Sequence, residues 1–255
     1  MTPIVEVDHL SKTYGKKINP VRVLDNISFD VFKGEFVGIM GPSGAGKTTL
    51  LNMLSTIDQP TLGRIKIGGQ DITRMKEKRL SDFRRRELGF IFQDFNLMNS
   101  LNVKDNIVLP LALERLPVKE MEARLEKVTK VLGIYHLLEA YPSDISIGQK
   151  QRVAAARGII TEPTLLLADE PTGSLDSKSA TELLQYLSKV NQEEQVTIFM
   201  VTHDAFTASY CHRILFIKDG AIFSEIVRQG SQKDFFQKVI DMQAMIGGGV
   251  GHDVI

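Results

Sequence analysis

The sequence contains a single cysteine, Cys211, and equal numbers of basic and acidic residues, 31 each. One cysteine excludes an internal disulfide bond and any zinc site built from several cysteines, so we expect an intracellular, reducing environment. Balanced charge provides no positive field that would recruit nucleic acid or an anionic membrane. We therefore expect no nucleic-acid partner.

Long apolar runs are also missing. No run approaches the roughly 18 residues that cross a bilayer, and "MTPIVEVDHL" lacks the basic-then-apolar pattern of a secretory signal. If the protein serves a membrane process, we expect another chain to supply the spanning segments. The 255 residues, with 43% apolar and 24% charged, are typical of a globular chain with one large domain or a domain with an insertion.

Alternating apolar and polar residues mark the N-terminal part. Ile4–Val7 and Val21–Phe32 have period two, which predicts antiparallel strands with a loop at Gly15 to Pro20. "GEFVGIM" is a short β-type run, and "GRIKIGGQDI" is typical of a hairpin. Residues 74–87 have a helical pattern and precede the strand "LGFIFQ".

The rest of the chain alternates between helical and strand patterns. Leu101 to Tyr141 is helical throughout, most clearly over Val118–Leu132. "PTLLLADE" and "VTIFMVTHD" are fully apolar short runs of the kind found in buried parallel strands, with a helix at about Ser177–Val190 between them. Strand, helix and strand with a helical insertion predict an α/β core plus a helical subdomain.

The stretch "GPSGAGKT" follows a predicted strand and opens a predicted helix, which is the context of a P-loop. Glycines permit a tight loop whose N–H groups point at phosphate oxygens, Lys47 brings positive charge to the β- and γ-phosphates, and Thr48 offers a hydroxyl to Mg²⁺. A plain glycine turn is the alternative, and the flanking strand and helix argue against it. We predict a nucleoside triphosphate site at Gly41, Pro42, Ser43, Gly44, Ala45, Gly46, Lys47, Thr48 and Thr49.

Acidic residues end the later strand "LLLADE". Asp169 is placed to hold Mg²⁺ through water, and Glu170 to polarise an attacking water. Gln93, after "LGFIF", is a candidate to reach both metal and water, although a loop glutamine is the ordinary alternative. His203 follows the strand "TIFMVT" and is a candidate contact for the γ-phosphate. We interpret the other histidines as structural.

The stretch "SDISIGQKQRVAAAR" contains Ser146 three residues before Gln149, the pattern of a capping box at a helix start. If Ser146 is the N-cap, Ile147 is the first helical residue, where a negative φ suits a β-branched side chain.

Together these motifs resemble ABC-type ATPase subunits across essentially the whole chain. The resemblance implies ATP and Mg²⁺ as cofactors and a P-loop NTPase core, a mixed sheet with helices, carrying an N-terminal antiparallel β subdomain and a helical insertion. It implies that Tyr14 stacks on adenine, that Gln93 senses the metal and couples to the membrane partner, and that Glu170 and His203 are the catalytic carboxylate and switch histidine. A strand-end tyrosine is the alternative for Tyr14.

The resemblance also implies a dimer of two copies with ATP sandwiched between them. The metal site would comprise Thr48, Gln93 and Asp169, and Asp176 in "GSLD" would link the two sites. The signature stretch would complete the site of the opposite chain through Ser146, Ile147, Gly148 and Gln149. The family places glycine where this chain has Ile147, so we expect a retained but weakened contact between chains.

Several stretches are similar to the ATPases of bacitracin- and lantibiotic-type resistance transporters, among them "STIDQPTLGRIKIGGQDIT" and "ADEPTGSLDSKSA". This similarity implies a separate multispanning permease, a peptide antibiotic or its lipid-bound complex as substrate, a permease that also signals to a sensor kinase, and a cytoplasmic location on the inner membrane face. The alternatives are ATPases of lipoprotein-release, macrolide-export or cell-division complexes, and a soluble scaffold ATPase.

We expect one ABC ATPase domain over residues 1–255. Its β/ATPase core would comprise about 1–93 and 158–225, and the helical subdomain with the signature stretch about 94–157. A C-terminal helix and mobile tail would occupy about 226–255, and the helical spacing of Phe235, Phe236, Val239 and Ile240 predicts that this helix packs on its own domain.

Overall fold

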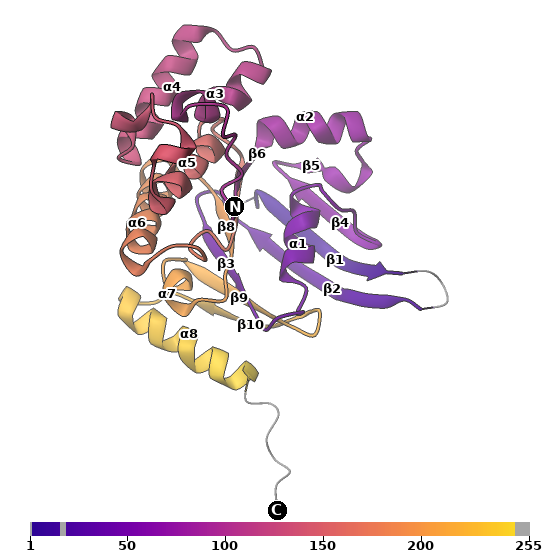
Figure 1. The fold of residues 1–255 in the computed structure, drawn as a ribbon. Helices are drawn as coiled ribbons and strands as arrows, with labels where there is room; N and C mark the ends of the chain where they lie inside the picture. Colours follow the sequence, from indigo (N-terminus) through magenta and orange to yellow (C-terminus); the bar gives the residue numbers. More distant parts are fainter. Residues whose placement is uncertain (1, 16–18, 248–255) are drawn as a thin grey trace, which may run out of the picture. The chain divides into compact units, whose positions relative to one another are not determined.

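The computed structural model of the chain describes residues 2–15 and 19–247 (Figure 1). Half of the predicted loop at Gly15 to Pro20, residues 16–18, and the predicted mobile tail beyond Gly247 lie outside the described residues. The chain divides into two compact units, residues 1–75 with 199–255 and residues 76–198. The boundary falls within strand β8, Ile198–Val201. In the described part of the chain, no helix is long and apolar enough to cross a membrane.

The first unit begins with a four-stranded sheet of order β2-β1-β4-β5. Its strands are β1 Val5–Tyr14, β2 Val21–Val31, β4 Leu62–Ile67 and β5 Gln70–Asp71. The predicted antiparallel pairing of the first two strands is confirmed, with Val5 opposite Val31. The predicted hairpin "GRIKIGGQDI" is β4 paired with β5.

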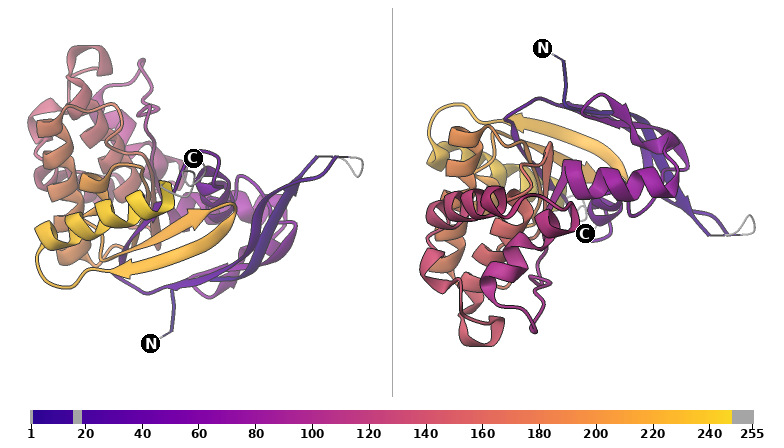
Figure 2. Two further views of the ribbon diagram at one scale, coloured as in Figure 1. Left: turned by 90° about the horizontal axis from the view of Figure 1, so that it is seen from below. Right: turned by 90° about the horizontal axis from the view of Figure 1, so that it is seen from above.

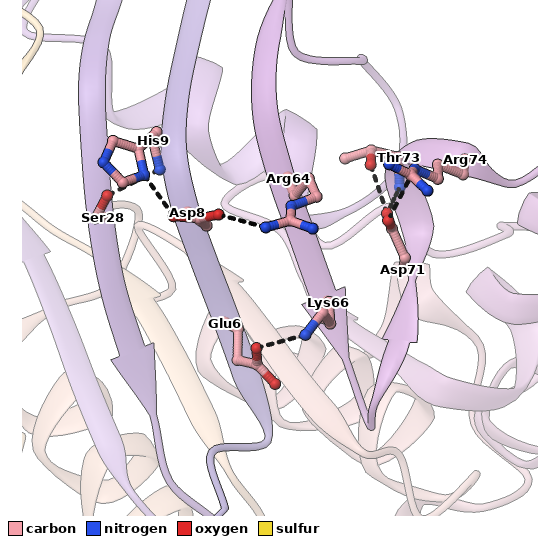
Figure 3. Close-up of polar contacts among 9 residues, drawn as sticks. All are labelled: Glu6, Asp8, His9, Ser28, Arg64, Lys66, Asp71, Thr73 and Arg74. Atoms are coloured by element: carbon pink, nitrogen blue, oxygen red, sulfur yellow. Dashed lines mark hydrogen bonds and ion pairs between the residues drawn. The ribbon is translucent and has the colours of Figure 1, made fainter.

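Alternation in β1 gives this sheet one buried and one charged face. Val5 and Val7 are buried, whereas Glu6 and Asp8 lie on the other face and pair with Lys66 at 2.8 Å and Arg64 at 2.9 Å (Figure 3). Each pair joins residues directly opposite in the β1–β4 register. Cross-strand charge pairs of this kind favour the observed register over a slipped one. A hollow of about 420 Å³ lies on this charged face.

The second sheet of this unit has the order β10-β9-β3-β8. Its further strands are β3 Phe36–Met40, β9 Arg213–Lys218 and β10 Ala221–Val227. The helices of the unit are α1 Lys47–Leu54, α7 Ala205–Ala208 and α8 Gln232–Gly247, with a 3₁₀ turn at Ile72–Arg74. The helix predicted to follow the phosphate loop is α1, which ends before Thr56, a residue with a left-handed φ of +62°.

Helix α8 packs on its own unit, as the spacing of its apolar residues predicts. Phe235 and Val239 are fully buried, although Ile240 remains 37% exposed. The helix runs beside the β9–β10 hairpin (Figure 2), and Lys218 Nζ on β9 donates to the carbonyl oxygen of Ile246 at 3.2 Å. At the other end of α8, Gln232 Nε2 donates to Ser209 Oγ at 3.0 Å.

The second unit contains two parallel strands, β6 Leu88–Ile91 and β7 Leu165–Asp169. Its helices are α2 Glu77–Glu87, α3 Val103–Leu113, α4 Val118–Val131, α5 Ile147–Ile159 and α6 Ser177–Glu194, with 3₁₀ turns at Tyr135–Leu137 and Pro142–Asp144. The segment between Leu101 and Tyr141 contains no strand, as predicted. The predicted fold class is confirmed: an α/β core with an antiparallel N-terminal sheet and a helical insertion.

Candidate nucleotide site

The phosphate loop begins where the fully buried strand β3 ends. Gly41 lies so close to β9 that a Cβ atom would be 2.0 Å from the carbonyl oxygen of Ile217. Gly46 is the N-cap of α1 with φ +102°, and a Cβ atom there would be 2.5 Å from Leu24. Only glycine satisfies both the close approach and the left-handed backbone at these two points. Pro42, Ser43, Gly44 and Thr48 are exposed, and Ala45 is buried.

Lys47 is held by the backbone of its own loop. Its Nζ donates to the carbonyl oxygens of Gly41 and Pro42, both at 2.8 Å. Helix α1 begins at Lys47 and has no acidic residue in its first turn. An ammonium group and the positive end of a helix dipole therefore meet at this loop, an arrangement suited to phosphate oxygens.

Tyr14, the candidate adenine contact, is the last residue of β1 and is 40% exposed. Its hydroxyl donates to Asp58 at 2.5 Å, and Lys12 Nζ lies 4.7 Å from the ring centroid. A side-chain hydrogen bond with Thr49 places the phenol beside α1. Burial and then the hydrogen bond to Asp58 raise the pKa of Tyr14. The structure thus places this aromatic ring beside the phosphate loop helix.

His203 follows β8 and is exposed. The preceding residue, Thr202, donates its N–H to the carbonyl oxygen of Ile39 at 3.1 Å, so the ends of β8 and β3 lie side by side. His203 therefore leaves the sheet at the edge where Gly41 opens the phosphate loop. The next residue, Asp204, caps α7 by accepting from Phe206 N and Thr207 N.

The acidic pair is at the end of β7 in the second unit. Asp169 is the last strand residue, and Glu170 has a left-handed φ of +44°. Non-glycine residues rarely adopt this conformation, and the strain it stores is frequent at functional sites. A turn bond from Gly173 N to the carbonyl oxygen of Glu170, at 3.0 Å, holds the bend.

Gln93 lies beside the Glu170 turn. Phe90 and Ile91 of β6 pair with Leu167 and Ala168 of β7. Gln93 and Glu170 are each two residues beyond a paired position, so both leave the sheet at the same edge. A Cβ atom on Gly173 would lie 3.0 Å from Gln93 Nε2, which places the glutamine side chain against this turn.

The signature stretch forms the N-terminus of α5. Ser146 is the N-cap, and the capping box with Gln149 is confirmed: Gln149 N donates to Ser146 Oγ at 3.2 Å, and Ser146 N donates to Gln149 Oε1 at 2.8 Å. Ile147 is the first helical residue, as predicted, and its side chain is 53% exposed. The isoleucine therefore projects outward from a helix end whose backbone geometry is ordinary.

Gly148 joins this helix end to the start of α6. A Cβ atom on Gly148 would be 2.6 Å from Ser179 Oγ. Asp176 is the N-cap of α6 and accepts from Lys178 N and Ser179 N at 3.0 Å and from Ser179 Oγ at 2.7 Å. The backbone and side-chain hydrogen bonds from Ser179 lower the pKa of Asp176. The predicted signature and dimer-loop residues thus lie next to each other within the second unit.

The residues predicted to hold the metal fit a hard cation in their chemistry. Thr48 offers a hydroxyl, Asp169 a carboxylate and Gln93 an amide oxygen, the oxygen ligands that Mg²⁺ prefers. Thr48 belongs to the first unit and the other two to the second. Within the described residues, no group of three or more His, Cys, Asp or Glu side chains forms a ready-made metal cluster.

Sequence reasoning missed two polar residues of α5, the buried Gln151 and the partly buried Arg157. Gln151 Nε2 donates to the carbonyl oxygens of Phe92 and Pro171, and the Arg157 guanidinium donates to those of Phe95 and Asn96. Their only signal was polar side chains within an alanine-rich helix, a pattern that a solvated helix face also produces. Asp58, which accepts hydrogen bonds from Lys12 and Tyr14, was also missed, because an aspartate in the loop after a helix has no local pattern that distinguishes it from a solvated residue.

Comparisons with known proteins agree with this geometry. The family described as "ABC transporter" matches residues 24–173. The bacitracin export ATP-binding protein BceA of Halalkalibacterium halodurans is 50% identical over 96% of this chain and 97% of that protein. The uncharacterized ABC transporter ATP-binding protein YvcR of Bacillus subtilis is 51% identical over 96% of this chain and 95% of that protein.

Solved structures agree as well. The dimeric structure of MJ0796, described as a bacterial ABC transporter cassette, covers 89% of this chain and 100% of its own with 35% identity and a TM-score of 0.80. The same cassette in a post-hydrolysis state bound to ADP and Pi aligns equally well. The chain therefore belongs to the ABC transporter family, as one of its ATP-binding ATPase subunits.

Proposed function

We propose that the chain hydrolyses ATP with Glu170 as the group that polarises the attacking water. Gly41 to Thr49 would hold the phosphates, with Lys47 at the β- and γ-phosphates, and Tyr14 would stack on adenine. The main support for this proposal is the strand–loop–helix around Lys47, because it brings an ammonium group and a helix N-terminus together at the phosphate loop. His203 and Gln93 would respond to the γ-phosphate and the attacking water from the edges of their strands.

Thr48, Gln93 and Asp169 would hold Mg²⁺. When bound, the ion supplies charge that neutralises the phosphate oxygens. The chain's own contribution is to hold the phosphates in the glycine loop and to keep Glu170 at a fixed turn. A carboxylate positioned this way accelerates proton transfer by about 10²–10⁴-fold.

Two copies of the chain would enclose ATP, with the α5 N-terminus of one copy facing the γ-phosphate held by the other. Such a contact is favourable only while the phosphate is present, so ATP would promote dimerisation and hydrolysis would loosen the dimer. The exposed position of Ser146 and Ile147 supports this proposal. Asp176, adjacent to Gly148 through Ser179, would link the two sites of the dimer.

The dimer would drive a separate multispanning permease from the inner face of the membrane, and its cargo would be a peptide antibiotic or its lipid-bound complex. The match to the bacitracin export protein spans nearly the full length of both chains, which supports a place among the ATPases of peptide-antibiotic resistance transporters. By contrast, the methionine import protein MetN 1 of Bacillus anthracis is 39% identical, and the match spans 66% of that protein. Signalling through the permease to a sensor kinase is part of the same proposal. A lipoprotein-release, macrolide-export or cell-division complex is the second candidate.

The variant Glu170→Gln tests the enzymatic assignment. We expect ATP turnover to fall by about 10²–10⁴-fold while ATP binding persists, because only the proton acceptor is removed. Glu193→Gln, an exposed change on α6, is the matched control and should retain turnover. Retained turnover in Glu170→Gln would contradict the assigned role.

The transport assignment is tested separately by purifying the tagged chain from a detergent extract of its source cells. Mass spectrometry should identify a co-purifying multispanning permease. Absence of any such partner would overturn the transport proposal and leave the ATPase assignment standing.

A further inference from the structure

Gln151, in the second turn of α5, has a fully buried side chain. Its Nε2 donates to the carbonyl oxygen of Phe92 at 3.0 Å and to that of Pro171 at 2.7 Å. Phe92 immediately precedes Gln93, and Pro171 immediately follows Glu170. A single amide group therefore joins the two backbone segments that carry these residues.

The contacts fix the orientation of the Gln151 amide. Both partners are carbonyl oxygens, which only accept, so the NH₂ group must face them. The Oε1 atom is buried and accepts no hydrogen bond from the part of the chain that the structure describes. A buried acceptor without a partner lowers stability, because the hydration it loses on folding is not replaced. The amide therefore serves the two carbonyl groups of Phe92 and Pro171, while its own oxygen stays unpaired within the described residues.

Helix α5 is also attached to β6 at close range. A Cβ atom on Gly89 would lie 2.1 Å from the carbonyl oxygen of Gly158, and one on Gly158 would lie 2.7 Å from that of Phe90. Further along, the Arg157 guanidinium donates to the carbonyl oxygens of Phe95, at 2.8 Å, and Asn96, at 2.6 Å.

The loop that contains Gln93 is thus held by α5 on both sides, by Gln151 before it and by Arg157 after it. Phe95 and Asn96 have left-handed φ values of +57° and +51°. Such conformations persist only where the surroundings enforce them, and Arg157 provides the bonds that do so. A displacement of α5 must therefore displace this loop.

We propose that Gln151 is a positioning residue for ATP hydrolysis, which transmits displacements of the Ser146–Gln149 end of α5 to Gln93 and Glu170. The inference rests on the proposed roles of those residues. In the dimer, the helix end would face the partner's nucleotide while Glu170 acts on the chain's own. Gln151 would then connect closure at one nucleotide site with catalysis at the other.

The test compares Gln151→Met with Asn191→Leu in the full-length chain. Methionine retains the length of the side chain but cannot donate to the two carbonyl groups. Asn191 is a matched control, because it is 2% exposed and its amide donates to the carbonyl oxygen of Val196 at 2.8 Å, at the other end of α6. For each variant we would measure kcat, KM for ATP, affinity for a fluorescent ATP analogue and the unfolding temperature.

For Gln151→Met we expect kcat to fall about 10–100-fold, because the segments that carry Gln93 and Glu170 would no longer be held in the geometry that hydrolysis requires. KM and analogue affinity should stay within about threefold of wild type, since Gln151 does not contribute to ATP binding. Asn191→Leu should lower the unfolding temperature and leave kcat within about twofold. Unchanged kcat in Gln151→Met, or an equal loss in Asn191→Leu, would overturn the inference. If Glu170→Gln retained activity, the proposed function itself would fail, which is a distinct outcome.

A second variant, Gln151→Glu, keeps the proposal testable if the methionine variant folds poorly. Its carboxylate cannot donate, but its protonated form can donate one hydrogen bond, and burial raises the pKa of such a group. The ratio of its kcat to that of wild type should therefore rise as the pH falls from 8 to 6. A flat ratio with reduced kcat would assign Gln151 a merely structural role.

Discussion

The hydrogen bonds that hold Lys47 in the phosphate loop reach back five and six residues, to Pro42 and Gly41. Those that hold the segments next to Gln93 and Glu170 reach 59 and 20 residues along the chain, to Gln151. The phosphate loop therefore holds its charged side chain with its own backbone. The second region depends on a helix that is remote in the sequence.

This difference explains why the phosphate loop can be recognised as a sequence motif, whereas the contacts that hold the Gln93 and Glu170 segments cannot. A loop that closes on itself needs glycines at fixed spacings, and that spacing is visible in "GPSGAGKT". A segment held by a distant helix needs only two or three side-chain donors, and Gln151 and Arg157 look like ordinary helix residues in the sequence. Long-range hydrogen bonds carry no local sequence pattern.

The largest expected effect concerns Gly41, where the phosphate loop depends on the distant strand β9. In Gly41→Ala, the added Cβ atom would lie 2.0 Å from the carbonyl oxygen of Ile217, so the loop must shift. We expect ATP affinity to fall by at least about 100-fold, because the N–H groups no longer converge on the phosphates. Isothermal titration with ATP measures this.

The control for that prediction is Gly44→Ala. A Cβ atom on Gly44 meets nothing within 4 Å, although its φ of +79° disfavours alanine. We expect a smaller loss of affinity, about tenfold or less, from backbone strain of about 1–2 kcal/mol. Equal losses in both variants would show that strain, and not the contact with β9, sets the requirement for Gly41.

A smaller effect is expected at the exposed end of α5. Replacing Ile147 with glycine removes a side chain that is 53% exposed, while Ser146 still caps the helix. Basal ATP turnover of the isolated subunit should rise about two- to fivefold, or about 0.4–1 kcal/mol in the barrier, as clearance for the opposite chain improves. Steady-state phosphate release is the measurement, with Ile147→Ala expected to be intermediate. Unchanged or lower turnover would contradict the hypothesis that Ile147 weakens the contact between the two chains.

The smallest effect concerns the start of β3, where Phe36 N donates to Nδ1 of His212 at 3.1 Å. Burial and then the charge of Arg228 lower the pKa of His212 from its usual 6.5, with Glu35 opposing. The unfolded state therefore binds the proton first as the pH falls. This contribution to the free energy of unfolding is complete above about pH 7.5 and is progressively lost as the pH falls through 6.5.

Chemical denaturation at pH 7.5 and 5.5 measures this loss. In His212→Asn, the amide oxygen retains an acceptor that does not titrate, so the stability of this variant should change less between the two pH values. An identical pH dependence in wild type and variant would show that His212 does not anchor the strand. The phosphate loop would then depend on fewer distant contacts than the bond to Phe36 N suggests.

Much of the fold could be predicted because its elements have strong local patterns. The alternation in β1 and β2, the apolar runs of β3, β7 and β8, and the capping box of α5 each predicted the observed element. Boundaries were less predictable. Helix α2 begins at Glu77, three residues after the predicted start at residue 74, because residues 72–74 form a 3₁₀ turn capped by Asp71.

The candidate site was predicted in part. The glycine loop, the acids at the end of β7 and the glutamine after β6 were predicted from their positions at strand ends, and the structure places each of them at a strand end. The left-handed backbone of Glu170, the contact of Gly148 with Ser179 and the partners of Tyr14 could not be found, since each depends on which segments meet in the folded chain.

The sequence by itself determined the chemistry: a glycine loop with Lys47, acids at a strand end, and a capped helix with Ile147 in place of a glycine. Only the tertiary structure decided how the capped helix is connected to the segments that carry Gln93 and Glu170, through the Gly89–Gly158 contact and the donors of Gln151 and Arg157. The physical reason is that spacing along the chain specifies turns and helices. Buried donors between segments are selected by the three-dimensional position of their acceptors.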